Sequence, residues 1–142
     1  MELQEIFDKA VGGVLRQGCL ARKDDDKCVY RGERDDGKTI ACGIGQLIPD
    51  NVYDTVLEDI PVNALLERAQ DDAGWRRAAE HFTDVVAPAV GLDLGDAKTR
   101  ELLNRIQLAH DDSHDIDEFR TRARNAARQM GLSTEIVEAD HA

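Results

Sequence analysis

Three side chains in this chain have the chemistry of a nucleophilic enzyme. Cys42 stands where an expected strand leads into a short helix, in the segment CGIGQLIPD. Backbone N–H groups at the start of a helix lower a thiol pKa and can stabilise an oxyanion. His110 and the adjacent Asp111 could supply a general base and its orienting carboxylate. As an enzyme, the protein would be a cysteine hydrolase or transferase that uses these residues.

Cys28 adds a second thiol and raises the question of a metal site. Cys28 and Cys42 with His110 or His114 would give the sulfur and nitrogen ligands that zinc prefers. Zinc ligands usually come from closely spaced pairs, and neither the cysteines nor the histidines have that spacing. In HDDSHD, residues 110–115, Asp112 or Ser113 is instead expected to cap a helix. We therefore predict neither a metal nor another cofactor.

The two cysteines flank a predicted antiparallel β-hairpin near residues 27–42. CVYR and TIAC have the composition of strands, and GERDDGK between them supplies turn residues. If the hairpin is symmetric about Asp35, Cys28 lies opposite Cys42 and Tyr30 lies opposite Ile40, all on one buried face. A thiol buried among apolar groups is inert. This register favours packing over catalysis, so a non-enzymatic protein is the preferred interpretation.

The rest of the sequence predicts helices. Apolar residues at helical spacing mark residues 3–17, with Gly18 at the C-terminal cap and Gly12 and Gly13 held by packing. Further helical segments are expected at 51–60 (weakly), 61–69, 71–90, 96–110 and from Ser113 or Asp115 to Gly131. The fold class is α+β: a mainly helical single domain of about five helices with one small hairpin.

We expect residues 1–131 to form this domain and 132–142 to be a loose, acidic C-terminal tail. KDDDK, residues 23–27, is expected to be a solvated loop. A chain of 142 residues is the size of one ordinary domain. No segment reaches the roughly 20 apolar residues of a membrane-spanning helix, and the acidic N-terminus does not resemble a secretory signal. Three cysteines suit a reducing compartment, so the expected location is the cytoplasm.

The formal net charge is −11, from 29 acidic and 18 basic residues. Such a charge repels nucleic-acid backbones and anionic lipid surfaces, so direct binding to either is not expected. It would attract a protein partner with a basic surface, including a nucleic-acid-binding protein. The alternative is that the charge only maintains solubility.

The motifs around the hairpin resemble small uncharacterised proteins encoded by phages and prophages. Those proteins carry a C-x-Y-R strand, a C-A-I-G-x-L-I-P-D-x-x-Y segment and an L-Q-x-x-H-D helix. The matching positions are Cys28, Tyr30, Arg31, Cys42, Gly45, Leu47, Ile48, Pro49, Asp50, Tyr53, Gln107, His110 and Asp111. Gly43 departs from the alanine of the pattern, and Cys19 has no counterpart in it. The resemblance implies that the gene belongs to a phage or prophage, so the expected cytoplasm is that of the host cell, and it implies no particular reaction.

This setting leads to a predicted function as a phage-associated interaction protein that inhibits a host defence system, as anti-CRISPR proteins do. The acidic surface would contact the basic partner, with Asp35, Asp36, Asp71 and Asp72 as the expected contacts. One alternative is a binding module that sequesters a small signalling nucleotide. In that alternative, Tyr30 and Trp75 would stack on the base, and Arg31 and Arg76 would hold phosphate. The other alternative is the cysteine enzyme.

Overall fold

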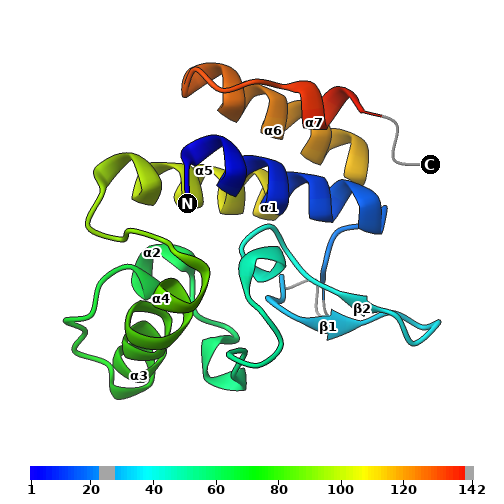
Figure 1. The fold of residues 1–142 in the computed structure, drawn as a ribbon. Coiled ribbons are helices and arrows are strands. Elements are labelled where there is room, and N and C mark those ends of the chain that lie inside the picture. Colours follow the sequence, from blue (N-terminus) through cyan, green and yellow to red (C-terminus); the bar gives the residue numbers. More distant parts are fainter. Residues whose placement is uncertain (23–27, 140–142) are drawn as a thin grey trace.

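The structure, a computed structural model, describes residues 1–22 and 28–139. Its three long helices pack on one another: α1 (Leu3–Gln17), α5 (Ala97–Asp111) and α6 (Ile116–Gln129). Figure 1 shows the shorter helices α2 (Val62–Leu65), α3 (Ala73–His81) and α4 (Ala87–Val90) gathered beneath one end of this layer. A hairpin of β1 (Gly32–Glu33) and β2 (Thr39–Ile40) lies beneath the other end. The mainly helical α+β fold is therefore confirmed.

Helix α1 has the predicted bounds and is central to the core. A capping box between Glu2 and Glu5 begins it, and Gly18 ends it with a left-handed φ of 80°. Its adjacent glycines are points where other segments approach the helix closely. A Cβ on Gly13 would lie 2.4 Å from Gln46 Oε1, and one on Gly12 would lie 2.9 Å from Ile136. These glycines allow η1 (Gly45–Leu47) and α7 (Glu135–Glu138) to approach α1 closely.

The hairpin has a different register from the one expected. Ile40 pairs with Gly32, and Thr39 pairs with Glu33, so the hairpin centres on Asp36 and not on Asp35. The cause is the turn: the Gly37 N–H donates to the Arg34 carbonyl at 2.9 Å, and Gly37 takes a φ of 82° that favours glycine. The predicted pairs of Cys28 with Cys42 and of Tyr30 with Ile40 are therefore wrong.

Residues 28–31 still run beside residues 39–42, because the Cys42 N–H donates to the Val29 carbonyl at 3.3 Å. Cys28 forms an isolated bridge with Arg22. Tyr30, Ile40 and Cys42 are buried as predicted, whereas Cys28 is only half-buried. Both faces of this paired segment are buried, since Val29 and Ala41 also lie in the core.

The predicted helix at 71–90 is a continuous helical run with a π-helical turn in its middle. Helix α3 passes into the π-helical η3 (Phe82–Val86) and then into α4. Pro88 lies in the first turn of α4, and Gly91 ends the run with a φ of 77°. The segments at 51–60 and 61–69 form less helix than expected: only the 3₁₀ turn η2 (Thr55–Leu57) and α2.

Both long C-terminal helices begin at an aspartate. Asp96 accepts from the Thr99 N–H at 3.0 Å, and Asp115 accepts from the Glu118 N–H at 2.8 Å. The prediction of Asp112 or Ser113 as a cap is wrong, because Ser113 Oγ donates back to the Ala109 carbonyl. Among the described helices, none is long and apolar enough to cross a membrane.

The expected loose tail is ordered over its described part, residues 132–139. Helix α7 packs on α1, and Val137 is fully buried. The apolar residues Ile136 and Val137, within an otherwise acidic segment, provide this anchor. The expected loop at 23–27 lies outside the described residues.

Candidate functional site

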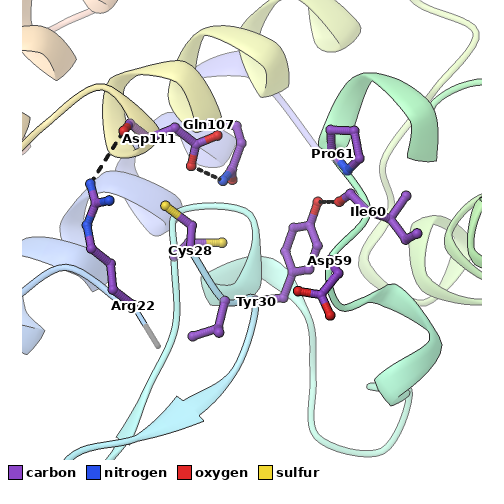
Figure 2. Close-up of a pocket in the computed structure, with 10 residues that line it drawn as sticks. Arg22, Cys28, Tyr30, Asp59, Ile60, Pro61, Gln107 and Asp111 are labelled. Atoms are coloured by element: carbon purple, nitrogen blue, oxygen red, sulfur yellow. Dashed lines mark hydrogen bonds between the residues drawn. The ribbon is translucent and has the colours of Figure 1, made fainter. Parts of the chain in front are cut away.

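A pocket of about 390 Å³ opens between the 28–30 strand, the 59–61 loop and α5. Figure 2 shows these residues from separate parts of the chain around one space. The wall combines sulfur, charged, amide and apolar groups: Arg22, Cys28, Val29, Tyr30, Cys42, Asp59, Ile60, Pro61, Gln107 and Asp111. This volume and mixture are typical of sites for small molecules.

The strand wall of the pocket is held by Glu58. Its carboxylate accepts from the backbone N–H groups of Tyr30 and Arg31 at 3.0 and 3.1 Å. It also accepts from the Tyr53 hydroxyl at 2.5 Å. The Tyr30 hydroxyl donates to the Ile60 carbonyl at 2.5 Å, which joins the strand to the 59–61 loop. These bonds fix the width of the pocket.

Backbone geometry also shapes the two sides of the pocket. A Cβ on Gly45 would lie 1.9 Å from the Tyr30 carbonyl oxygen, so only glycine permits this approach. On the opposite loop, Asp59 has a φ of 67° and is the only non-glycine residue with positive φ in the described part of the chain. Backbone conformations of this kind concentrate at functional sites, where surrounding contacts maintain them.

Helix α5 supplies the polar wall. Gln107 and Asp111 lie one turn apart, and the Gln107 Nε2 donates to Asp111 Oδ1 at 2.8 Å. Burial opposes ionisation of the Asp111 carboxyl, but the neighbouring His110, Cys28 and Gln107 side chains outweigh burial and lower its pKa. The pocket therefore contains a carboxylate that is ionised at neutral pH.

Arg22 closes the C-terminal end of α5. Its guanidinium donates to the carbonyls of His110 at 3.1 Å and Asp111 at 3.4 Å, and also to that of Ser113. The last carbonyls of a helix carry partial negative charge and lack partners within the helix. Arg22 satisfies them and is positioned beside Asp111, as Figure 2 shows.

His110 is fully buried behind this wall. The Ala21 N–H donates to His110 Nε2 at 3.0 Å. A backbone N–H can only donate, so Nε2 must accept, and the neutral imidazole carries its proton on Nδ1. Nδ1 lies 3.8 Å from Asp111 Oδ1 and has no hydrogen-bond partner in the described part of the chain.

This tautomer bears directly on metal binding. One ligand atom from each of Cys28, His110 and Asp111 lies within 4.8 Å of the others, a spacing that a metal ion can bridge. A metal would need the lone pair of Nδ1, the ring nitrogen near Asp111, and would put the ring proton on Nε2. That proton would face the Ala21 N–H. The hydrogen bond of Ala21 therefore opposes a metal at this cluster.

The predicted nucleophile, Cys42, is buried with 1% exposure. Burial raises its pKa to about 12, although N–H groups of Gly45 and Ile44 act in the opposite direction. The predicted help from a helix start is thus present, since the Gly45 N–H lies 3.4 Å from the sulfur, but burial outweighs it. Cys42 and Asp111 line the same pocket, while the Nδ1 proton prevents His110 from acting as a base through that nitrogen.

Cys28 is more accessible than Cys42 as a candidate nucleophile, because it is only half-buried. Its thiol is nevertheless difficult to ionise. Burial, followed by the hydrogen bond and charge of Asp111, raises its pKa to about 12. Both Cys28 and Cys42 are free thiols. A thiol of this pKa is almost wholly protonated at neutral pH and is a poor nucleophile.

The four acidic residues expected to contact a protein partner lie on two separate elements. Asp35 and Asp36 belong to the hairpin turn, whereas Asp71 and Asp72 precede α3. Figure 1 places the hairpin and α3 at opposite sides of the molecule. Asp36 pairs with Arg34, and Asp72 caps α3 by accepting from the Trp75 N–H at 2.9 Å.

The residues expected to bind a nucleotide also remain apart. Tyr30 lines the pocket, but Trp75 and Arg76 lie on α3 and outside it. Arg31 pairs with Asp50, donates to the Ile48 carbonyl at 2.7 Å and lies over the Tyr53 ring. Arg76 donates to the carbonyls of Gln70 and Asp71. Both guanidiniums hold the chain's own loops.

Sequence reasoning assigned no function to several residues of the pocket. Gln107 is one of them; it lies four positions before Asp111 in IQLAHDD and shares its helix face, and this spacing could have identified the two as a pair. Arg22, Glu58 and Asp59 have no such signal, because loops bring them to the site.

Comparison of the chain with protein-family models, with curated proteins and with solved structures finds no match.

Proposed function

We propose that this protein is a non-enzymatic binding protein that holds a small molecule in the pocket between the 28–30 strand, the 59–61 loop and α5. One observation carries this proposal. Gln107 lines the pocket and is only 6% exposed, yet its Oε1 has no hydrogen-bond partner among the described residues. A buried amide oxygen without a partner costs about 1–3 kcal/mol. A ligand that donates to Oε1 removes this cost.

Further support comes from how the pocket is constructed. Glu58 joins the strand wall to the rest of the chain by three hydrogen bonds, and Gly45 allows a contact that no other residue permits. Asp59 is held with a positive φ beside the same space. Preorganised walls of this kind lower the entropy lost when a ligand binds.

The ionisation of the thiols favours binding over catalysis. Cys28 and Cys42 are the nucleophiles that line the pocket, and burial raises the pKa of each to about 12. The nearby His110 imidazole carries its proton on Nδ1, so this nitrogen has no lone pair with which to accept a proton from a thiol. Sequestration of a small molecule is the alternative to direct inhibition of a defence protein that the phage resemblance suggests, and the phage setting stays a prediction.

The test is a screen by protein-observed NMR against a mixture of cationic, neutral and anionic fragments. Fragments that bind as proposed shift the amide signals of residues 28–30, 59–61, 107 and 111. Ile60→Trp, which places a large side chain at the pocket, should abolish these shifts. Leu108→Trp is the matched control, because Leu108 is 58% exposed on α5 and lies outside this pocket.

Shifts that persist in Ile60→Trp, or that arise only elsewhere on the surface, would contradict the proposal. Melting curves of both variants establish that each remains folded under the conditions of the screen.

A further inference from the structure

We infer that the ligand of this pocket is a small organic cation: a primary amine whose ammonium group donates to Gln107 Oε1 and to the Asp111 carboxylate. Its apolar body would lie against Tyr30, Ile60 and Pro61. This inference rests on the proposed function, because it names the chemical class of the molecule that the pocket holds.

The hydrogen-bonding groups of the α5 wall require a donor. Gln107 Nε2 already donates to Asp111, and the Gln107 carbonyl oxygen has no hydrogen-bond partner among the described residues. Asp111 is ionised, and a carboxylate only accepts. Figure 2 shows Gln107 and Asp111 side by side, with the Gln107 amide next to the Asp111 carboxylate. An ammonium group has three N–H donors and no acceptor, so it satisfies both residues.

The charges around the pocket also favour a cation. Among the described residues, two carboxylates, Asp59 and Asp111, line it together with one guanidinium, Arg22. Arg22 is directed at the carbonyls that end α5, so its positive charge offsets the negative end of that helix. The net charge of the chain, −11, adds a long-range attraction for cations and a repulsion for anions.

The remaining wall is apolar and determines the rest of the ligand. The Tyr30 hydroxyl is committed to the Ile60 carbonyl, which leaves the ring as the surface that lines the pocket. Ile60 and Pro61 continue this surface on the opposite loop, and Val29 extends it on the strand. Such a wall stabilises an alkyl or aryl group by burial. A fully hydrated inorganic cation could not use this contact.

The experiment compares three molecules of one shape: 2-phenylethylamine as the cation, 2-phenylethanol as the neutral analogue and phenylacetate as the anion. Titration by protein-observed NMR gives both the affinity and the location of each. We expect 2-phenylethylamine to shift the signals of residues 28–30, 59–61, 107 and 111 and to bind about tenfold or more tightly than 2-phenylethanol. Phenylacetate should bind least.

Two adjacent aspartates provide a matched pair of variants. Asp111→Asn should weaken binding of the amine about tenfold, because it removes the carboxylate to which the ammonium group is expected to donate. Asp112→Asn removes the same charge one position away and outside this pocket, so binding should change by less than about twofold. Gln107→Met, which keeps the length of the side chain and removes the oxygen, should also weaken the amine, because the ammonium group loses one of its two acceptors.

The outcomes separate the inference from the proposed function. If the alcohol or the anion binds in this pocket as tightly as the amine, the cation assignment is wrong and the binding function stands. Equal losses in Asp111→Asn and Asp112→Asn would show a general charge effect and would also overturn the assignment. If neither these molecules nor the fragment mixture shifts the pocket residues, both proposals fail.

Discussion

The backbone N–H of Ala21 donates to the Nε2 atom of His110 at 3.0 Å and thereby fixes the tautomer of a fully buried imidazole. The ring proton must then lie on Nδ1, toward Asp111. One hydrogen bond between residues far apart in the sequence thus prevents Nδ1 from acting either as a base or as a metal ligand.

The tautomer can be measured directly. Long-range ¹H–¹⁵N correlation spectra should show His110 with a protonated Nδ1 and an unprotonated Nε2. Addition of zinc at a stoichiometric concentration should leave this pattern unchanged, and His114, which is exposed, serves as the reference in the same spectra. A proton on Nε2, or its appearance there when zinc is added, would contradict the hydrogen bond from Ala21.

The thiols should differ in reactivity according to their burial. In the native protein near pH 7.5, iodoacetamide should label the partly exposed Cys19 first, Cys28 slowly and Cys42 last. The pKa of both Cys28 and Cys42 is raised to about 12, so the thiolate is scarce at this pH. Mass spectrometry of peptides after timed quenching gives the three rates, and labelling in denaturant should equalise them. Fast labelling of Cys42 would support the alternative that the protein is a cysteine hydrolase or transferase.

The raised pKa of Cys42 also predicts sensitivity to alkaline pH. In the unfolded chain the thiol titrates near its ordinary value of 9.0, and in the folded protein near 12. Between these values the unfolded state releases a proton that the folded state retains, so the free energy of unfolding falls as pH rises. The slope from this group is up to about 1.4 kcal/mol per pH unit. Below pH 9 the Cys42 thiol is protonated in both states, so it does not make the free energy of unfolding depend on pH.

Denaturant melts between pH 7 and 11 test this expectation, with Cys42→Ala as the control. The variant is less stable throughout, because a buried side chain is truncated, but its stability should fall less steeply above pH 9. Identical slopes in the two proteins would rule out Cys42 as the source.

Gly45 should be irreplaceable because of its distance from the Tyr30 carbonyl. Gly45→Ala would place a Cβ 1.9 Å from that oxygen, and relief requires the strand wall to move. We expect a loss of about 1–3 kcal/mol in the free energy of unfolding, together with weaker ligand binding. Gly74→Ala is the control: its Cβ would meet only the Asp72 carboxylate, at 3.2 Å, and stability should change by less than about 1 kcal/mol. Equal effects of the two substitutions would contradict the close approach at Gly45.

The sequence predicts the long helices of this fold well and the register of the short hairpin poorly. The bounds of α1 follow from seven apolar residues at helical spacing and from Gly18, whose left-handed conformation ends the helix. The hairpin has only two paired residues in each strand, so its register depends on the turn. Gly37 determines that turn through its positive φ. The assumption that the hairpin is symmetric about Asp35 does not take this glycine into account.

The candidate site was only partly predictable for the same reason. Cys28, Tyr30, Cys42 and Asp111 lie in recognisable motifs, and all four line the pocket. Their chemistry depends on partners that no spacing indicates: Ala21 for His110, and Glu58 for the 28–31 strand. Burial then decides the ionisation of the thiols, and burial is a property of the whole fold.

Glu58 provides the last test of how the pocket is held. Its two carboxylate oxygens accept from the Tyr30 and Arg31 N–H groups and from the Tyr53 hydroxyl. Glu58→Ala leaves two backbone donors without this acceptor, and we expect the free energy of unfolding to fall by about 2–4 kcal/mol. Tyr53→Phe removes the third donor and keeps the carboxylate, so the loss should be about 1 kcal/mol.

Amide hydrogen exchange adds a readout that separates positioning from general stability. In Glu58→Ala, the amides of Tyr30 and Arg31 should exchange much faster than those of α1, because the carboxylate that holds the strand is gone. In Tyr53→Phe these two amides should stay protected, since both of their hydrogen bonds remain. Uniform acceleration across the whole chain in Glu58→Ala would mean that Glu58 stabilises the fold without specifically positioning the pocket wall.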